Sequence, residues 1–206
     1  MSQGYLRIRN EYLVQAWARS PAELAVCLPA EIENDCLIFQ AFGEKCILSR
    51  EEILLSGESA AGPVGLLVAL YASRVPDLTV QLHPLKSFKE LPHSMPYHAA
   101  FAANAEQILV PQVIKINRHQ EKIVSALSGY INQDAMSGDF SFTLLPLPRI
   151  PLYYIFHLLD DEFPASVTCL FSNNASLFMP IDGLADIAEY TAKKIINIID
   201  KMLFIN

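Results

Sequence analysis

The sequence predicts an α+β fold: a mainly antiparallel sheet, made of one hairpin and a C-terminal three-strand meander, packed with several helices and a long C-terminal helix. Three observations predict it. Apolar residues recur at helical spacing near both ends of the chain, branched and aromatic residues flank a glycine turn at 36–49, and three apolar runs follow one another between residues 140 and 171. The 206 residues suit a single domain, with residues 1–30 as a helical extension.

The first half of the chain is predicted to hold three helices and the hairpin. Residues 4–19 carry apolar side chains at helical spacing, and Ser20-Pro21-Ala22-Glu23 is typical of a capping box that starts a second helix. Residues 36–49 are expected to form two strands around a tight turn at Phe42-Gly43. The apolar stretch from Pro63 onward predicts a helix that is buried on most sides.

The second half is predicted to be a broken helix, a meander and a final helix. Prolines punctuate residues 80–96, which indicates a loop with room for one short strand, and Pro111 is expected to interrupt a helical region. In chain order, the remaining expected elements are a broken helix at 97–128, a polar connector at 129–139, strands at 140–145, 151–159 and 166–171, and a helix at 181–203.

Composition excludes several classes of function. Apolar residues make up 52% of the chain and charged residues 18%, a balance that excludes disorder and indicates a large core or an apolar patch that another chain covers. The net charge of −7 and the scattered lysines and arginines argue against a nucleic-acid partner. Apolar runs are far shorter than the roughly 20 residues that cross a bilayer, and the N-terminus does not resemble a secretory signal. A cytoplasmic protein without a membrane span is therefore expected.

Cysteine and histidine spacings do not predict a metal centre or a cofactor. Cys27, Cys36, Cys46 and Cys169 lack the CxxC-type pairs that aim two thiolates at one ion, so they are expected to be reduced, buried thiols. Histidines gather at 83–98, but their spacing matches no familiar ligand set. No catalytic elbow and no phosphate-binding glycine loop occurs among the eight glycines, which favours a non-enzymatic role.

Two neighbouring motifs are candidates for ligand binding. Arg149 lies between Pro148 and Pro151 at the start of an apolar strand, where its guanidinium requires either a structural ion pair or an anionic ligand. The acidic turn 160–162 provides three successive carboxylates, which suit a hard cation, an acid–base pair, or plain solvation. We interpret the first motif chiefly as structural and leave cation binding at the turn open.

The final helix is a candidate interface. Five of its apolar residues occupy most of its circumference, so the helix either threads into the core or docks against a second chain. These residues are Ile195, Ile198, Ile199, Met202 and Leu203. Near its start, Asp182, Asp186 and Glu189 share one face, where the helix dipole stabilises negative charge.

Several phrases together resemble the uncharacterised prokaryotic family DUF3786, from about residue 35 to the end of the chain. They are FQAFGEKCIL (39–48), GLLVALYAS (65–73), SFKELP (87–92), LPLPRIPLYYI (145–155), DDEFPASVTCLF (160–171) and NNASLFMPIDGLADIAEY (173–190). The resemblance implies no established activity. It implies an accessory role in anaerobic redox or one-carbon metabolism, because some members resemble this domain joined to an iron–sulfur module, which this chain lacks.

The resemblance also selects residues for attention. Carried over position by position, they are Phe88, Glu90, Pro92, Arg149, Glu162 and Phe163. The segment 91–98 departs from the glycine-bearing turn usual in the family, which puts any ligand contact of that loop in doubt.

Two hypotheses for the function follow. The first is an accessory domain that docks onto a protein partner or a second copy of itself. The alternative is an enzyme or a small-molecule binding protein, with an anionic ligand held by Arg149 and Glu162 under the loop 83–98.

Overall fold

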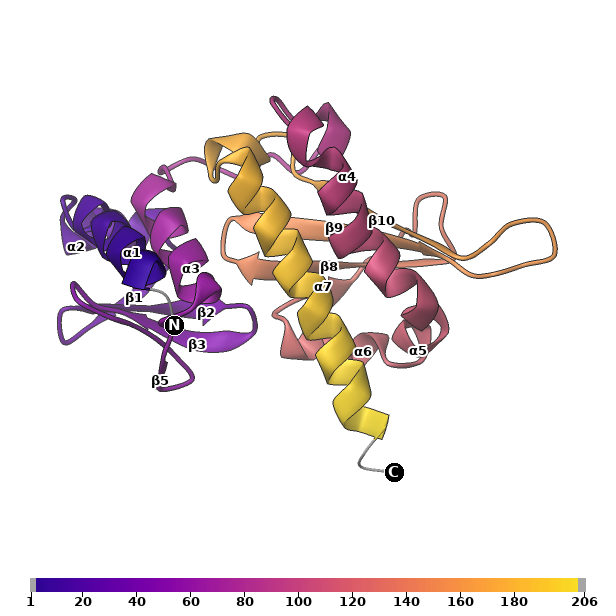
Figure 1. The fold of residues 1–206 in the computed structure, drawn as a ribbon, viewed down its shortest axis with the longest axis horizontal. Helices are drawn as coiled ribbons and strands as arrows, with labels where there is room; N and C mark the ends of the chain where they lie inside the picture. Colours follow the sequence, from indigo (N-terminus) through magenta and orange to yellow (C-terminus); the bar gives the residue numbers. More distant parts are fainter. Residues whose placement is uncertain (1–2, 204–206) are drawn as a thin grey trace.

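The computed structural model describes residues 3–203 as two antiparallel five-stranded sheets, each with helices packed against it (Figure 1). The predicted α+β class is confirmed. The predicted hairpin and the predicted meander, however, belong to different sheets, one in each half of the molecule. Short strands complete both sheets, and the sequence pattern allowed for only one of them, within residues 80–96.

The first sheet is a simple meander in the order β1-β2-β3-β4-β5. Its strands are β1 (Glu31–Glu33), β2 (Cys36–Ala41), β3 (Glu44–Leu48), β4 (Ile53–Leu55) and β5 (Glu58–Ser59), and its helices are α1 (Gln3–Ala16), α2 (Pro21–Cys27) and α3 (Pro63–Arg74). Alternate residues are buried, because Leu37 pairs with Leu48 and Phe39 with Cys46 on the same face.

Local sequence signals fix two features of this half. Ser20 and Glu23 form the predicted capping box: the Glu23 amide donates to the Ser20 hydroxyl at 3.3 Å, and the Ser20 amide donates to the Glu23 carboxylate at 2.9 Å. In the predicted hairpin turn, Phe42 has φ 54° and Gly43 has φ 77°. Two successive positive φ angles match the right-handed twist of the strands on either side.

The second sheet has the order β6-β10-β9-β8-β7. Its strands are β6 (Lys86–Ser87), β7 (Tyr130–Ile131), β8 (Phe140–Leu147), β9 (Ile150–His157) and β10 (Ser166–Phe171). The three long strands confirm the predicted meander. β6 and β7 contribute two residues each, too few for a period-two pattern to be recognised in the sequence.

Helices cover one face of the second sheet, and the polar connector packs on the other. The helical segments are α4 (His98–Phe101), a π-helical turn at Ala102–Glu106, a 3₁₀ segment at Gln107–Gln112 containing Pro111, α5 (Val113–Arg118), α6 (Gln120–Ala126) and α7 (Ile181–Leu203). On the opposite face, the Tyr153 hydroxyl donates to the Asp134 carbonyl at 2.7 Å, and Thr143 donates to the Asn132 side chain at 2.9 Å. Both faces of the central strands are consequently buried.

The two halves meet along α7 and at the β2–β3 turn (Figure 1). The Phe42 amide donates to the Pro146 carbonyl on β8 at 2.6 Å, and the Phe42 ring meets the Tyr190 ring edge-on with 4.7 Å between centroids. Lys194 on α7 forms an ion pair with Glu44 on β3. The hairpin turn is therefore one of the contacts that join the two halves.

We expect Gly43→Ala to destabilise the protein far more than Gly57→Ala. Both glycines have positive φ, at 77° and 86°, so an alanine at either costs about 1–2 kcal/mol of backbone strain. A Cβ at Gly43 would in addition lie 1.9 Å from the Ala126 carbonyl oxygen, whereas a Cβ at Gly57 meets nothing within 4 Å. Urea unfolding should show an additional loss of at least about 2 kcal/mol for Gly43→Ala. Equal losses of unfolding free energy in the two variants would contradict the close approach of Gly43 to the Ala126 carbonyl.

Candidate functional site

Arg149 lies in the β8–β9 turn and reaches across to the first half of the molecule. Its Nε donates to the Cys27 carbonyl at 2.7 Å and one terminal nitrogen to the Val26 carbonyl at 2.7 Å, while the other donates to the Leu78 carbonyl. Val26 and Cys27 end α2, where helical carbonyls lack intrahelical partners. The guanidinium thus caps α2, and its positive charge lies at the negative end of the helix.

The other contacts of Arg149 are also structural. Its amide donates to the Tyr71 hydroxyl at 3.1 Å, and burial raises the pKa of this phenol well above its ordinary value. Asp77 lies 3.7 Å from a terminal nitrogen, but its side chain is 69% exposed, so this ion pair is weak. Backbone carbonyls therefore supply most of the compensation for this partly buried charge.

Glu162 and Phe163 lie at the opposite end of β9 from Arg149, in the turn that joins β9 to β10. The eight residues of β9 rise about 3.3 Å each, which separates its ends by roughly 23 Å. The structure does not bring Arg149 and Glu162 together. A shared anion site would also need free guanidinium nitrogens, and backbone carbonyls accept hydrogen bonds from all three.

The β9–β10 turn is a projecting tip with a fixed backbone (Figure 1). One Asp160 carboxylate oxygen accepts hydrogen bonds from the amides of Glu162 at 2.8 Å and Phe163 at 2.7 Å. These two donors lower the pKa of Asp160 below its ordinary value. The turn presents apolar side chains to solvent: Leu159 is 68% exposed and Phe163 is 66% exposed.

A hollow of about 510 Å³ lies beside this tip, between the hairpin and the polar connector. Its lining residues are Asp139, His157, Leu158, Asp160, Phe163, Pro164 and Ser166. The connector is tied to the hairpin, because the Leu158 amide donates to the Asp139 carboxylate at 2.7 Å. We call residues 134–139 and 158–164 together the tip surface. It combines exposed hydrocarbon with five carboxylates, those of Asp134, Asp139, Asp160, Asp161 and Glu162.

Phe88 and Glu90 occupy structural positions. The Phe88 ring is buried and stacks on Phe101 with 4.2 Å between centroids and 6° between planes. Glu90 closes a capping box: the Ser87 amide donates to its carboxylate at 2.8 Å, and Ser87 lowers the pKa of Glu90. Pro92 follows on the surface. The segment SFKELP thus shapes the start of the helical layer.

The final helix threads partly into the core of its own chain. Ile195 and Ile199 are buried in the core, and Ile198 is half-buried against it. Met202 is also half-buried, and the Leu203 side chain lies outside the described residues. Of the two alternatives that the sequence left open, packing within the chain accounts for Ile195 and Ile199.

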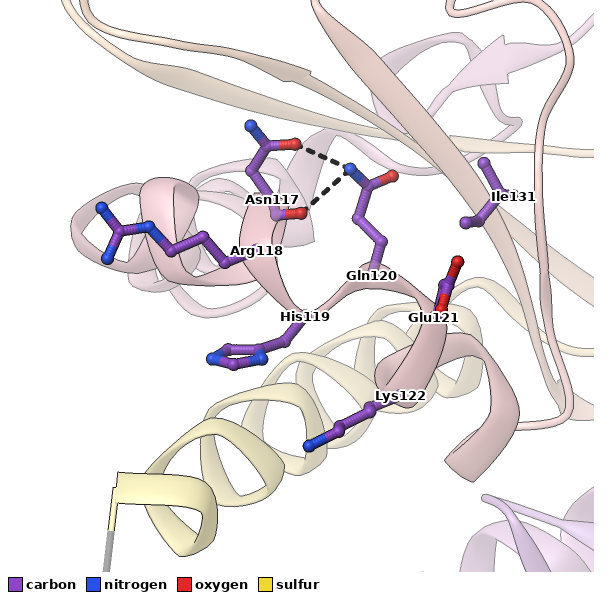
Figure 2. A pocket seen from close by; sticks show the side chains of 7 residues that line it. All are labelled: Asn117, Arg118, His119, Gln120, Glu121, Lys122 and Ile131. Atoms are coloured by element: carbon purple, nitrogen blue, oxygen red, sulfur yellow. Dashed lines mark hydrogen bonds between the residues drawn. The ribbon is translucent and has the colours of Figure 1, made fainter. Parts of the chain in front are cut away.

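Within residues 3–203, no three histidine, cysteine or acidic side chains converge in an arrangement that suits a metal ion. A surface pocket of about 280 Å³ lies at the α5–α6 corner, and His119 is the histidine that lines it. Figure 2 shows Arg118, His119 and Lys122 pointing outward, away from the Asn117 and Gln120 side chains, which are joined by a 2.7 Å hydrogen bond. These basic groups do not converge on one point.

Sequence reasoning missed a polar cluster at the π-helical turn, in which Glu106 is half-buried and Tyr154 and Cys169 are buried. The Glu106 carboxylate accepts a 2.9 Å hydrogen bond from the Cys169 amide on β10. β6 pairs only with the last two residues of β10, so this amide faces an edge that lacks a strand partner. Burial raises the pKa of Glu106, although the Cys169 amide and His98 oppose the shift.

Tyr154 and Cys169 complete the cluster. The Tyr154 hydroxyl is buried and interacts with the Cys169 thiol, which is buried beside it. Burial raises the pKa of both the Tyr154 phenol and the Cys169 thiol, and the Glu106 carboxylate raises each further. The thiol is therefore protonated and unreactive at neutral pH. The sequence around Glu106 gives no sign that its carboxylate accepts a hydrogen bond from the edge of β10.

The fold and the site define a class: an α+β protein with two helix-covered antiparallel sheets, whose charged motifs serve structure or face solvent. The chain belongs to the family described as Domain of unknown function (DUF3786), whose model matches residues 20–194. Neither the curated proteins nor the solved structures compared with this chain include a match. No helix within residues 3–203 has the length and apolarity needed to span a membrane.

We expect Arg149→Lys to lower the free energy of unfolding by about 1–2 kcal/mol, because a lysine ammonium cannot reach three divergent carbonyls and the end of α2 loses charged donors. Urea unfolding followed by circular dichroism measures the loss. Arg118→Lys is the matched control, since Arg118 is exposed, and it should change stability by less than about 0.5 kcal/mol. A stability of Arg149→Lys equal to that of the control would contradict the capping role.

We expect Glu106→Gln to be more stable than the native chain at pH 7, and Glu106→Ala to be less stable by about 1–3 kcal/mol. Glutamine keeps an acceptor for the Cys169 amide without a buried charge, whereas alanine leaves that amide unpaired. The folded pKa of Glu106 is raised, so native stability falls as pH rises through the interval above the ordinary value of 4.5. The advantage of Glu106→Gln should accordingly vanish below that pH. An advantage independent of pH would exclude desolvation of Glu106 as its cause.

Proposed function

We propose that this protein is an accessory domain that acts by binding another protein, with the tip surface as its docking site. One observation carries the proposal: Phe163 and Leu159 are about two-thirds exposed on a turn whose backbone is held by Asp160. Exposed large apolar side chains on a rigid projection lose little conformational entropy on binding, which is the usual property of an interface anchor.

The charge of the tip surface specifies the partner's chemistry. Its five carboxylates include the exposed Asp161 and Glu162, and the whole chain has a net charge of −7. A complementary surface presents lysine or arginine around an apolar pocket that receives Phe163. We place this partner in anaerobic redox or one-carbon metabolism, and this step is supported by the family resemblance alone.

Photo-crosslinking tests the docking site. With benzoylphenylalanine in place of Phe163, illumination of native cells should give one discrete adduct with a protein that carries a basic surface. The same probe in place of Val14 is the matched control, because Val14 is 72% exposed on α1, in the other half of the molecule. It should give no such adduct.

Binding measurements with the purified protein and its identified partner give the contribution of Phe163 to the affinity. Phe163→Ala should weaken binding of the identified partner about 30-fold, the loss expected of an interface anchor, and Val14→Ala should leave it unchanged. Raised salt should weaken binding by the native chain, because exposed charges are screened. Absence of an adduct at position 163, or equal adducts at both positions, would refute the tip surface as the docking site. An adduct between two copies of this chain would identify the partner as the protein itself.

A further inference from the structure

A second hollow, of about 480 Å³, lies where α1 and α3 of the first half meet α7 of the second. Figure 1 shows α3 between α1 and α7. The lining residues are Tyr5, Pro63, Val64, Leu66, Leu67, Asp186, Glu189, Tyr190 and Lys193. We call this hollow the α3–α7 groove. Its size and its place between two structural layers are typical of small-molecule sites.

Two walls of the α3–α7 groove are mainly apolar. Val64 and Leu66 are half-buried on α3, and Tyr5 is 45% exposed on α1. α3 is apolar on nearly all sides, so a stripe of its hydrocarbon remains uncovered where α1 and α7 diverge. A ligand with an apolar body would remove this stripe from water, which is favourable by about 25 cal/mol for each Å² buried.

The third wall, from α7, contains one carboxylate without a partner. Both Glu189 oxygens are engaged, one by Lys193 at 2.5 Å and the other by the Asn104 amide at 3.0 Å. Asp186 is exposed to solvent at the rim of the groove, and it makes no hydrogen bond and no ion pair with any residue in the described part of the chain, 3–203. The groove therefore holds an acidic group whose charge is not neutralised by contact.

Electrostatics select the charge of the ligand. Burial raises the pKa of Asp186, and Glu189 and Asp182 raise it further, while Lys193 opposes them. Asp186 and the neighbouring Asp182 would repel an anion, and the charge of Lys193 is already engaged by Glu189. A neutral apolar molecule would desolvate Asp186 without compensation. A cation beside Asp186 would be attracted to the carboxylate and would compensate for its desolvation. A hydrocarbon chain attached to this cation would cover Val64 and Leu66.

We propose that the α3–α7 groove binds a small organic ammonium ion, with its charged nitrogen at Asp186 and its apolar body between Val64, Leu66 and Tyr5. This site is distinct from the tip surface, which is built from the β9–β10 turn and the connector. It therefore does not depend on the proposed docking function.

Titration with n-hexylammonium chloride tests the proposal, with n-hexanol and sodium hexanoate as matched probes of equal chain length. Amide shifts in ¹H–¹⁵N spectra should move for residues of α3 and α7 with hexylammonium and far less with the other two. Asp186→Asn should weaken hexylammonium binding about threefold, the loss expected of one ion pair that is partly exposed to solvent. Asp200→Asn is the matched control, an equal change of charge at an exposed position of the same helix, and should leave binding unchanged.

The pH profile is the decisive readout. An alkylammonium stays protonated to about pH 10, so any rise in affinity across the acid range reports ionisation of the protein. The titratable groups that line the groove are Tyr5, Tyr190, Lys193, Glu189 and Asp186, and Asp182 lies nearby. The carboxyl of Asp186, whose pKa is raised, should dominate this rise. The rise should be lost in Asp186→Asn and kept in Asp200→Asn. Binding of hexanoate equal to that of hexylammonium, or no loss of binding in a folded Asp186→Asn, would overturn the proposal.

Discussion

The contact between the guanidinium of Arg149 and the end of α2 determines how the two halves of this protein fit together. A guanidinium stays charged at every accessible pH, so once removed from water it requires acceptors in fixed positions. The carbonyls of Val26, Cys27 and Leu78 supply them, and the first two of these carbonyls in turn need donors because α2 ends there. The guanidinium provides donors for the carbonyls and the carbonyls provide acceptors for the guanidinium, which makes the arrangement of the halves specific as well as stable.

The same device recurs within the first half. Arg19 donates to the Val75 carbonyl at 2.8 Å and to the Ala72 carbonyl, both at the end of α3. α2 and α3 are short, and short helices are marginal without tertiary support. Arginines distant in sequence provide this support at their C-terminal ends. Two of the chain's charged residues that might be taken for ligand-binding groups are thereby assigned to structure, and function must be sought elsewhere.

The two surfaces that we propose for binding are acidic and partly apolar. The tip surface and the α3–α7 groove both place carboxylates beside uncovered hydrocarbon, although one projects from a hairpin and the other lies between helices. An acidic chain that uses two of its arginines, Arg19 and Arg149, to cap helices has fewer cations left to pair with such carboxylates. Its surface therefore favours ligands and partners that carry positive charge. The two sites differ in shape, because the tip surface projects from the molecule and the α3–α7 groove is a recess.

The sequence by itself determined the elements that depend on neighbouring residues: the Ser20–Glu23 capping box, the Phe42-Gly43 turn, the long strands of the second sheet and the final helix. Their signals are periodicity and turn chemistry, which act over a few residues. Only the tertiary structure decided that the strands divide into two sheets, that Arg149 caps α2, and that Glu106 serves the edge of β10. These contacts join residues 63 to 123 positions apart, and no local pattern encodes which distant acceptor a buried donor will meet.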